Sequence, residues 1–452
     1  MTRQLEKPNA PLLCGSITDS FAYLTIKDRM PVILTKILDQ FARMQYKGLD
    51  GKTVHFSPDQ LAQLKEITFD ISELKYNMVR DRPLTPISSH SPSDWTESAV
   101  ASLTADSNVW NAAMEELGDA LACTWFQAPW LFVECYMYRA LRQIITARNA
   151  WTDFDVFAQD KQTSLIGSIQ SILQLSTTLG TKTNGIDSDL MRELIQFSLW
   201  GNQTDLSLLV HAKHDDLHKL QVSGKNQLAA VCNNIIVNDI DRVIGKIQSV
   251  HTGDVVFVLD NAGFELFADL CMADHLTLST DCRIVFQVKQ YGWFVSDTTI
   301  SDFHQTLDVC QTQAEIHGCA ILMEAVSRWR LWLKNGRWIL EQDPFWTTPF
   351  PFWRMPDKAC VLLQTLSDAK FIFFKGDLNY RKMVHDASWP TTTTLEEAIG
   401  PLAKTQIAPF VLLRTCKSDT IVGLVEGQAE KLTEIDANWM VNGKFGVIQY
   451  HE

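Results

Sequence analysis

Four polar stretches in the C-terminal half of this 452-residue chain carry side chains suited to chemistry. The first is Asp260-Asn261, which directly follows the apolar run Val255–Leu259, and the second is Asp297, within Ser296–Thr299. Two carboxylates and an amide oxygen are hard ligands, which suit Mg²⁺ or Mn²⁺ with several waters left on the ion. Asp260, Asn261 and Asp297 are therefore candidate metal ligands, and the two aspartates are candidate catalytic groups.

The other two stretches are cationic. Lys375-Gly376-Asp377-Leu378-Asn379 follows the run Phe371–Phe374, and Arg414-Thr415-Cys416-Lys417 follows Phe410–Leu413. Lysine and arginine attract anions, and a glycine turn can aim backbone N–H groups at them. A divalent metal beside such a cradle is what phosphoryl transfer requires, because the metal neutralises phosphate oxygens and lowers the pKa of a water.

Each stretch also has a purely structural explanation. An aspartate after a strand often caps the following helix, as Asp260 or Asp297 would do here. Lys-Gly-Asp is a common turn, and Arg414 and Lys417 could form a solvated face. The case for a site rests on all four stretches falling at strand ends of one domain, where they could converge.

The elements that would position these residues alternate from about Asn226 onward. Apolar, strand-like runs alternate with helical patterns, which predicts a doubly wound and mostly parallel α/β sheet. Ligands of such sheets bind beyond the carboxyl ends of the strands. Gly336–Pro351 is rich in Trp and Pro and is expected to be an insertion over the sheet. The predicted strands are Val255–Leu259, Arg283–Val288, Phe371–Phe374, Phe410–Leu413 and Phe445–Gln449, and the helices between them are Phe264–Asp274, Asp302–Glu315 and Cys360–Ser367.

The N-terminal half has helical spacing almost throughout. Residues 1–20 are expected to be a loose arm, Tyr23–Met44 a helix, and 56–79 a second helix with Ser57 as N-cap and Pro58 at its first position. We expect two domains, a mostly helical one over 1–225 and an α/β catalytic one over 226–452.

Composition excludes several classes of function. The formal net charge of −13 disfavours binding to nucleic-acid backbones and to anionic membranes. The first residues have no apolar leader, and no stretch is a convincing membrane span. The ten cysteines include no Cys-x-x-Cys pair, so they are interpreted as reduced thiols. A cytoplasmic protein, or one that is also nuclear, is expected.

Other motifs are weak or missing. His211, His214 and His218 have the helical spacing of a zinc site, but the segment is so polar that a solvated helix face is favoured. There is no P-loop and no Gly-x-Gly-x-x-Gly, which counts against a common dinucleotide or methyltransferase loop. Ser296 lacks the Gly-x-Ser-x-Gly elbow of a serine hydrolase.

Together these stretches resemble the DUF89 family of metal-dependent damage-control phosphatases. The Arg-Thr-x-Lys element at 414–417 points to the subfamily that acts on sugar phosphates, also called the acidic residue methyltransferase 1 family. Two segments of the helical half agree with the family, Leu199–Ser207 and Ala128–Arg139. The matching C-terminal segments are Leu259–Leu266, Phe294–Asp297, Lys375–Lys382 and Arg414–Lys417.

The resemblance implies a helical N-terminal region on a Rossmann-like three-layer α/β/α core. It also implies a divalent metal on Asp260, Asn261 and Asp297, and a cofactor contact at Glu265 if the protein were a methyltransferase. One departure is visible, because the family's His-x-Lys-x-x-Pro is Gln287-Val288-Lys289-Gln290-Tyr291-Gly292 here. The substrate contacts that it implies are Asp260, Asn261, Glu134, Arg139, Lys375, Gly376, Asp377, Leu378, Asn379, Arg414 and Lys417.

The leading hypothesis is a phosphatase of small phosphorylated sugars that uses Mn²⁺, Mg²⁺, Co²⁺ or Ni²⁺. Water activated at the metal would attack the phosphate, with Asp260 or Asp297 accepting the proton. An aspartyl-phosphate route is the variant, although Ala262 stands where an Asp-x-Asp phosphatase has its acid–base group. The alternatives are an S-adenosylmethionine-dependent protein-glutamate O-methyltransferase and a non-catalytic scaffold. The expected partner is a small sugar phosphate, and a monomer is favoured.

Overall fold

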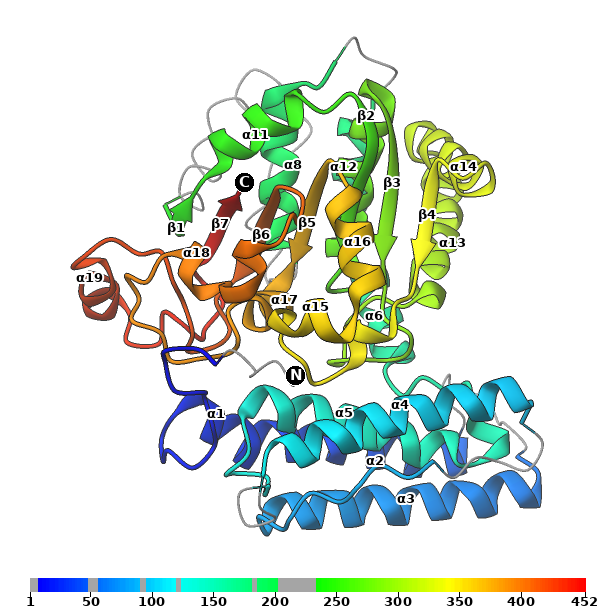
Figure 1. Cartoon of the computed structure of the whole chain (residues 1–452). Coiled ribbons are helices and arrows are strands. Elements are labelled where there is room, and N and C mark those ends of the chain that lie inside the picture. The colour runs from blue at the N-terminus through cyan, green and yellow to red at the C-terminus, as the bar shows by residue number, and fades with distance from the viewer. Residues whose placement is uncertain (1–6, 48–55, 90–94, 119–122, 181–184, 202–232) are drawn as a thin grey trace.

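A seven-stranded sheet forms the centre of the protein, with strand order β1-β7-β6-β5-β2-β3-β4 (Figure 1). The computed structural model describes residues 7–47, 56–89, 95–118, 123–180, 185–201 and 233–452. All neighbouring strands are parallel except β6 and β7, which are antiparallel. The strands are β1 (Ile235–Asn238), β2 (Thr252–Val258), β3 (Asp281–Gln287), β4 (Trp338–Glu341), β5 (Phe371–Lys375), β6 (Phe410–Thr415) and β7 (Gly446–His451).

Both faces of this sheet are covered, which explains why the buried parts of the central strands, such as Val255–Val258 of β2, are apolar at successive positions. In β2, Val255 and Phe257 belong to one hydrophobic cluster, whereas Val256 and Val258 belong to the other. This alternation follows from the two-residue period of a strand. The result is a three-layer α/β/α arrangement, as predicted.

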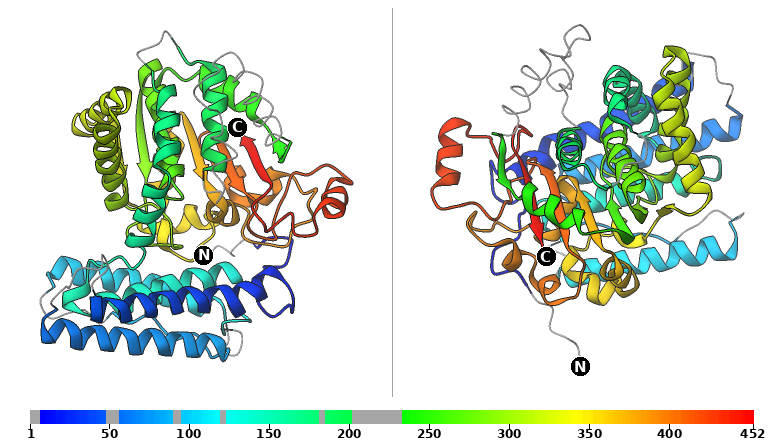
Figure 2. Two further views of the ribbon diagram at one scale, coloured as in Figure 1. Left: turned by 180° about the vertical axis from the view of Figure 1, so that it is seen from behind. Right: turned by 90° about the horizontal axis from the view of Figure 1, so that it is seen from above.

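One layer contains long helices seen from behind in Figure 2, and the other contains shorter helices in front of the sheet in Figure 1. The first layer comprises α6 (Ala158–Gly167), α7 (Ile169–Leu175), α8 (Ser188–Trp200), α11 (Ile240–Gln248), α12 (Phe264–Ser279), α13 (Ile300–His317) and α14 (Ala320–Lys334). The second comprises α15 (Met355–Lys358), α16 (Cys360–Asp368), α17 (Gly376–Met383) and α18 (Leu395–Ala398), and α19 (Gln428–Ile435) follows β6.

A helical bundle lies across the end of the sheet at which the parallel strands β2 to β5 finish (Figures 1 and 2). Its helices are α1 (Phe21–Leu24), a π-helical turn (Thr25–Arg29), α2 (Met30–Lys47), α3 (Pro58–Val79), α4 (Glu97–Glu116) and α5 (Trp130–Thr146). Helix α3 begins as predicted, since Ser57 forms a capping box with Gln60. The bundle thus covers the edge where a ligand of a parallel sheet binds.

The predicted α/β class, the helical N-terminal region and the five predicted strands are confirmed. The interpretation of 336–351 as an insertion is wrong for Trp338–Glu341, which form β4 and pair in parallel with β3. This strand was missed because its apolar run is short and adjoins a segment rich in Trp and Pro. The short edge strand β1 was not predicted either. Among the described residues, no helix is long and apolar enough to cross a membrane.

The domain boundary expected at residue 225 lies among residues that the structure does not describe, so it stays a prediction. The packing of the helices indicates a different boundary. Helices α6 to α8 precede that boundary in sequence, yet their apolar residues Leu165, Ile172 and Leu194 pack in the cluster that covers the sheet. A division by packing would therefore fall near residue 158, after the bundle and before α6.

Candidate active site

Asp260, Asn261 and Asp297 meet at the carboxyl end of β2, where the sequence predicts a metal site. The loop after β3 folds back along the residues that follow β2. Backbone hydrogen bonds join the two segments, with Thr298 N–H donating to Asp260 O at 2.7 Å and Ala262 N–H donating to Ser296 O at 2.8 Å. Asn261 and Asp297 form an isolated antiparallel bridge between the segments. Residues 36 positions apart in sequence are thus held side by side.

The side chain of Asn261 is fixed from three directions. Its Nδ2 donates to Asp260 Oδ2 and, at 2.8 Å, to Glu265 Oε2, and its Oδ1 accepts from the Ser296 hydroxyl. Glu265 lies in the first turn of α12, so this helix supports the amide. Ser296 and Glu265 therefore determine which way the Asn261 oxygen faces.

Lys289 is a site residue that the sequence analysis did not single out for a role. Its Nζ donates to Leu259 O at 3.1 Å and lies 3.2 Å from Asp297 Oδ2, and the side chain is buried. The signal was available, since a lysine directly after an apolar strand needs a buried partner. Lys289 ties the end of β2 to the Asp297 loop.

The site concentrates buried negative charge. Burial raises the pKa of Asp260 well above its usual value, and the charges of Asp297 and Glu265 raise it further. Burial likewise raises the pKa of Asp297 to about 6, although the ammonium of Lys289 opposes this. Repulsion between such carboxylates is relieved when a cation binds between them.

The donor set fits a divalent cation. Among the described residues, no group of three or more His, Cys, Asp or Glu side chains is arranged to hold a metal ion. Asp260, Asn261 and Asp297 supply two carboxylates and an amide, and Asp297 Oδ2 is a buried oxygen paired with the Lys289 ammonium at 3.2 Å. Hard oxygen ligands with open positions suit Mg²⁺ or Mn²⁺. A metal would be held by these three residues.

Gly376 brings a helix N-terminus to the same place. Its φ of +85° is in the left-handed region, and a Cβ there would lie only 1.9 Å from Asp260 Oδ2. Strand β5 ends at Lys375 and α17 begins at Gly376. The first N–H groups of a helix have no partner within it and favour an anion, so α17 can bind a phosphate beside Asp260.

Three predicted substrate contacts on this turn face the interior instead. Lys375 Nζ lies 2.9 Å from Glu265 Oε1 and 3.0 Å from Asp269 Oδ1. Burial alone would lower the pKa of Lys375, but Asp269 and Glu265 raise it above its usual value. Asn379 Nδ2 donates to Lys375 O at 2.7 Å, and Leu378 is buried. These side chains hold the start of α17 in position.

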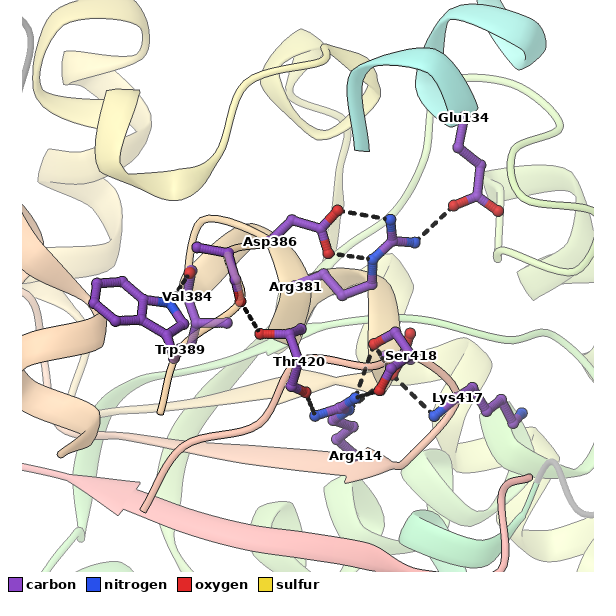
Figure 3. A network of polar contacts seen from close by, with 11 residues as sticks. Glu134, Arg381, Val384, Asp386, Trp389, Arg414, Lys417, Ser418 and Thr420 are labelled. Atoms are coloured by element: carbon purple, nitrogen blue, oxygen red, sulfur yellow. Dashed lines mark hydrogen bonds and ion pairs between the residues drawn. The ribbon is translucent and has the colours of Figure 1, made fainter. Parts of the chain in front are cut away.

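The buried Arg414 pairs with Asp377, which is partly buried. Arg414 Nε donates to Asp377 Oδ1 at 2.7 Å, and its other nitrogens donate to Ser418 and to Thr420 O. The Lys417 N–H also donates to Asp377 Oδ1, at 3.2 Å. Arg414 thus shapes the loop that carries Lys417, whose side chain extends away from the guanidinium in Figure 3. The charge of Lys417 lowers the pKa of Asp260, opposing the effect of burial.

The structure does not bring the two predicted residues of α5 into this group. Glu134 Oε2 accepts from Arg381 Nη1 at 2.6 Å, and Arg381 also pairs with Asp386 (Figure 3). Arg139 Nε donates to Asp106 Oδ2 of α4 at 2.6 Å. Their substrate-binding role stays a prediction. His211, His214 and His218 lie outside the described residues.

The fold and this arrangement of oxygen ligands and backbone donors are suited to an enzyme that acts on phosphate. The chain matches the family described as the damage-control phosphatase ARMT1-like domain over residues 25–432. It is 36% identical over 463 residues to damage-control phosphatase ARMT1 of Danio rerio, with 97% of this chain and 96% of the relative covered. The relative of the same name from Homo sapiens is 33% identical over 459 residues, covering 97% and 98%.

The chain therefore belongs to the damage-control phosphatase ARMT1-like family and is an enzyme of the phosphatase class. Members of this family generally depend on a metal. A crystal structure of a DUF89 family protein from Pyrococcus horikoshii aligns with 77% of this chain and 91% of its own. The TM-score is 0.41 at 10% identity, which is too low to support any argument about this chain.

Proposed function

We propose that this protein hydrolyses small phosphorylated sugars, such as fructose 1-phosphate and related hexose and pentose phosphates, with a divalent cation. One observation carries the proposal. Asp260, Asn261 and Asp297 lie together at the strand ends, and Gly376 places the N-terminus of α17 against the Asp260 carboxylate. Ligands for a metal and donors for a phosphate are thus adjacent, which is the arrangement that phosphoryl transfer needs.

Each part of the site has a role in this reaction. Asp260, Asn261 and Asp297 would hold Mn²⁺, Mg²⁺, Co²⁺ or Ni²⁺, which would neutralise phosphate charge and lower the pKa of a water. The N–H groups at the start of α17 donate to phosphate oxygens, and Lys417 adds a positive charge. Asp260 or Asp297 accepts the proton of the attacking water.

The proposal also specifies which group attacks the phosphate. Water is favoured over Asp260 as nucleophile, because the carboxylate of Asp260 packs against Gly376 and accepts from Asn261. Residue 262 is also alanine, so the acid–base group of an Asp-x-Asp phosphatase is missing. Rapid acid quenching during turnover tests this, since a stable phosphoenzyme on Asp260 would reverse the preference.

A phosphate-release screen tests the function as a whole. The full chain is assayed with fructose 1-phosphate, fructose 6-phosphate and ribose 5-phosphate, in the presence of each of the four metals and of a chelator. We expect release with at least one metal and none with the chelator. Absence of release from every sugar phosphate with every metal would contradict the proposal. The setting that we propose is the removal of damaged metabolites by a monomer in the cytoplasm, or also in the nucleus.

The methyltransferase alternative depends on Glu265 as a cofactor contact. Both of its carboxylate oxygens are already engaged, since Oε2 accepts from Asn261 and Oε1 from Lys375 at 2.9 Å. The residue is also buried. These contacts favour a supporting role in the phosphate site. Calorimetric titration with S-adenosylmethionine separates the alternatives, because a phosphatase should show no binding.

A further inference from the structure

A cavity of about 670 Å³ lies between α2 of the bundle and the loop that carries Asp297. Its wall includes Arg29, Lys36, Phe157, Phe294 and Ser296. A volume of this size is typical of a small-molecule site. The proposed reaction uses none of the residues on the bundle side, so the cavity has no role assigned so far.

The cavity adjoins the candidate metal ligands. Ser296 lines it and donates its hydroxyl hydrogen to Asn261 Oδ1. Phe294 stacks on the ring of Tyr138 with centroids 4.7 Å apart, and the charges of Arg29 and Asp297 both act on the pKa of Tyr138. A sugar phosphate whose phosphate lies beside Asp260 would therefore extend its other end toward this cavity.

Three cations line the bundle side of the cavity at intervals of seven residues, Arg29, Lys36 and Arg43. This spacing places them on one face of a helix. Arg43 pairs with Asp39 at 2.5 Å, which neutralises it. Arg29 and Lys36 have no carboxylate partner among the described residues, and Asp160 is the remaining acidic residue of the wall. The wall thus holds three cations against two carboxylates, in a protein with a net charge of −13.

The backbone on both sides of the cavity departs from regular structure. Arg29 ends a π-helical turn, Thr25–Arg29, a rare conformation that recurs at functional sites. On the opposite side, Phe294 and Val295 have φ values of +45° and +69°. A left-handed conformation is costly for a β-branched residue such as Val295, and such strain is found mainly where a site requires a particular geometry.

We propose that this cavity is a second anion subsite, in which Arg29 and Lys36 bind a negatively charged group at the end of the substrate remote from the transferred phosphate. This inference rests on the proposed function and narrows its substrate class. The favoured substrates are small sugars that carry a phosphate at one end and a second phosphate or a carboxylate at the other.

The test compares three substrates by kcat/KM for phosphate release. Fructose 1,6-bisphosphate has a second phosphate, 6-phosphogluconate has a carboxylate, and fructose 1-phosphate has a neutral far end. The variants are Arg29→Met and Lys36→Met. The matched control is Lys27→Met, which removes a charge from the same π-helical turn but outside the cavity wall.

We expect the wild-type protein to prefer at least one of the two substrates with a second anionic group. Removing either cation should lower kcat/KM for that substrate by about ten- to a hundredfold, the range for a hydrogen bond to a charged group. The loss for fructose 1-phosphate should stay below about threefold, as for a screened surface charge. Lys27→Met should leave all three values unchanged. Comparing fructose 1,6-bisphosphate with 6-phosphogluconate shows whether the subsite binds a phosphate or a carboxylate.

Several outcomes would overturn the subsite. The first is a wild-type preference for fructose 1-phosphate. The second is an equal loss of kcat/KM on all three substrates in Arg29→Met and Lys36→Met, and the third is no loss of kcat/KM in either variant. If the wild-type protein releases phosphate from nothing, the proposed function fails separately. Calorimetry of the metal-free protein with fructose 1,6-bisphosphate then decides the subsite. Binding that weakens at least about tenfold in Arg29→Met supports it, whereas equal or absent binding overturns it.

Discussion

Gly376→Ala perturbs the contact between the first residue of α17 and the Asp260 carboxylate. The new methyl group would lie 1.9 Å from Asp260 Oδ2 and 2.1 Å from its Cγ, so the carboxylate has to move by more than an ångström. A misplacement of this size in a catalytic group costs about a hundredfold in rate. Alanine at a φ of +85° also destabilises the fold by about 1–2 kcal/mol.

Gly318→Ala separates these two effects. Gly318 also has a positive φ, +63°, and caps α13, but no atom lies within 4 Å of the position of its Cβ. The substitution therefore adds backbone strain without displacing a side chain. Both variants should lose a similar, small amount of thermal stability, and only Gly376→Ala should lose activity.

The assay pairs metal-dependent phosphate release with thermal unfolding on the same samples. We expect kcat/KM to fall by about a hundredfold in Gly376→Ala and to stay near the wild-type value in Gly318→Ala. The reasoning is refuted if Gly376→Ala keeps most of its activity while folded, or if both variants lose activity equally.

Three further perturbations test the site and the core. Asp297→Asn removes a carboxylate ligand but keeps the shape, so phosphate release should fall by at least about a hundredfold; the metal-free protein should still unfold cooperatively near the wild-type temperature. Glu265→Gln weakens the hydrogen bond that positions Asn261 and should reduce metal affinity by about ten- to a hundredfold, measured by titrating activity with Mn²⁺. An unchanged metal affinity would show that Glu265 does not position Asn261. Burial lowers the pKa of Lys382 from 10.5 to about 8. Between pH 8 and 10.5 the unfolded chain therefore binds more protons than the folded chain. Below pH 8 the buried charge of Lys382 lowers the free energy of unfolding by about 3 kcal/mol, and this destabilisation is lost as the pH rises. At pH 7, Lys382→Met should therefore be more stable than wild type, although losing the hydrogen bond to Thr348 O reduces the gain. In denaturant melts the gain should shrink as the pH approaches 10.5. A gain that does not change with pH would contradict the lowered pKa.

The sequence was sufficient to predict the central strands and the proximity of the candidate metal ligands. The second half of strand β2, Val255–Val258, is apolar without interruption because it is covered on both faces, and a run of this kind ends where polar residues begin. Asp260 and Asn261 therefore had to lie at the carboxyl edge. The loop of Asp297 follows the neighbouring strand, β3, so parallel pairing brings it to the same edge.

The direction of the cationic side chains could not be predicted in the same way. Lys375 and Arg414 lie at the carboxyl ends of β5 and β6 as expected, yet their charges face the carboxylates of Asp269 and Asp377. These partners lie 106 and 37 residues away along the chain. A local pattern shows that a charge follows a strand, but only the tertiary arrangement decides whether it meets another side chain or a ligand.

The position of β1 in the sheet has a consequence for synthesis. Among the described residues, its only strand partner is β7, about 200 residues later in the chain, and Asp239 N–H also donates to Ile448 O. At ribosomal rates of roughly 5–20 residues per second, β1 waits for about 10–40 s before that partner exists. During this interval β1 presents an unpaired edge that can join other chains. Late completion of the sheet therefore predicts that the nascent chain is prone to aggregate until translation is complete.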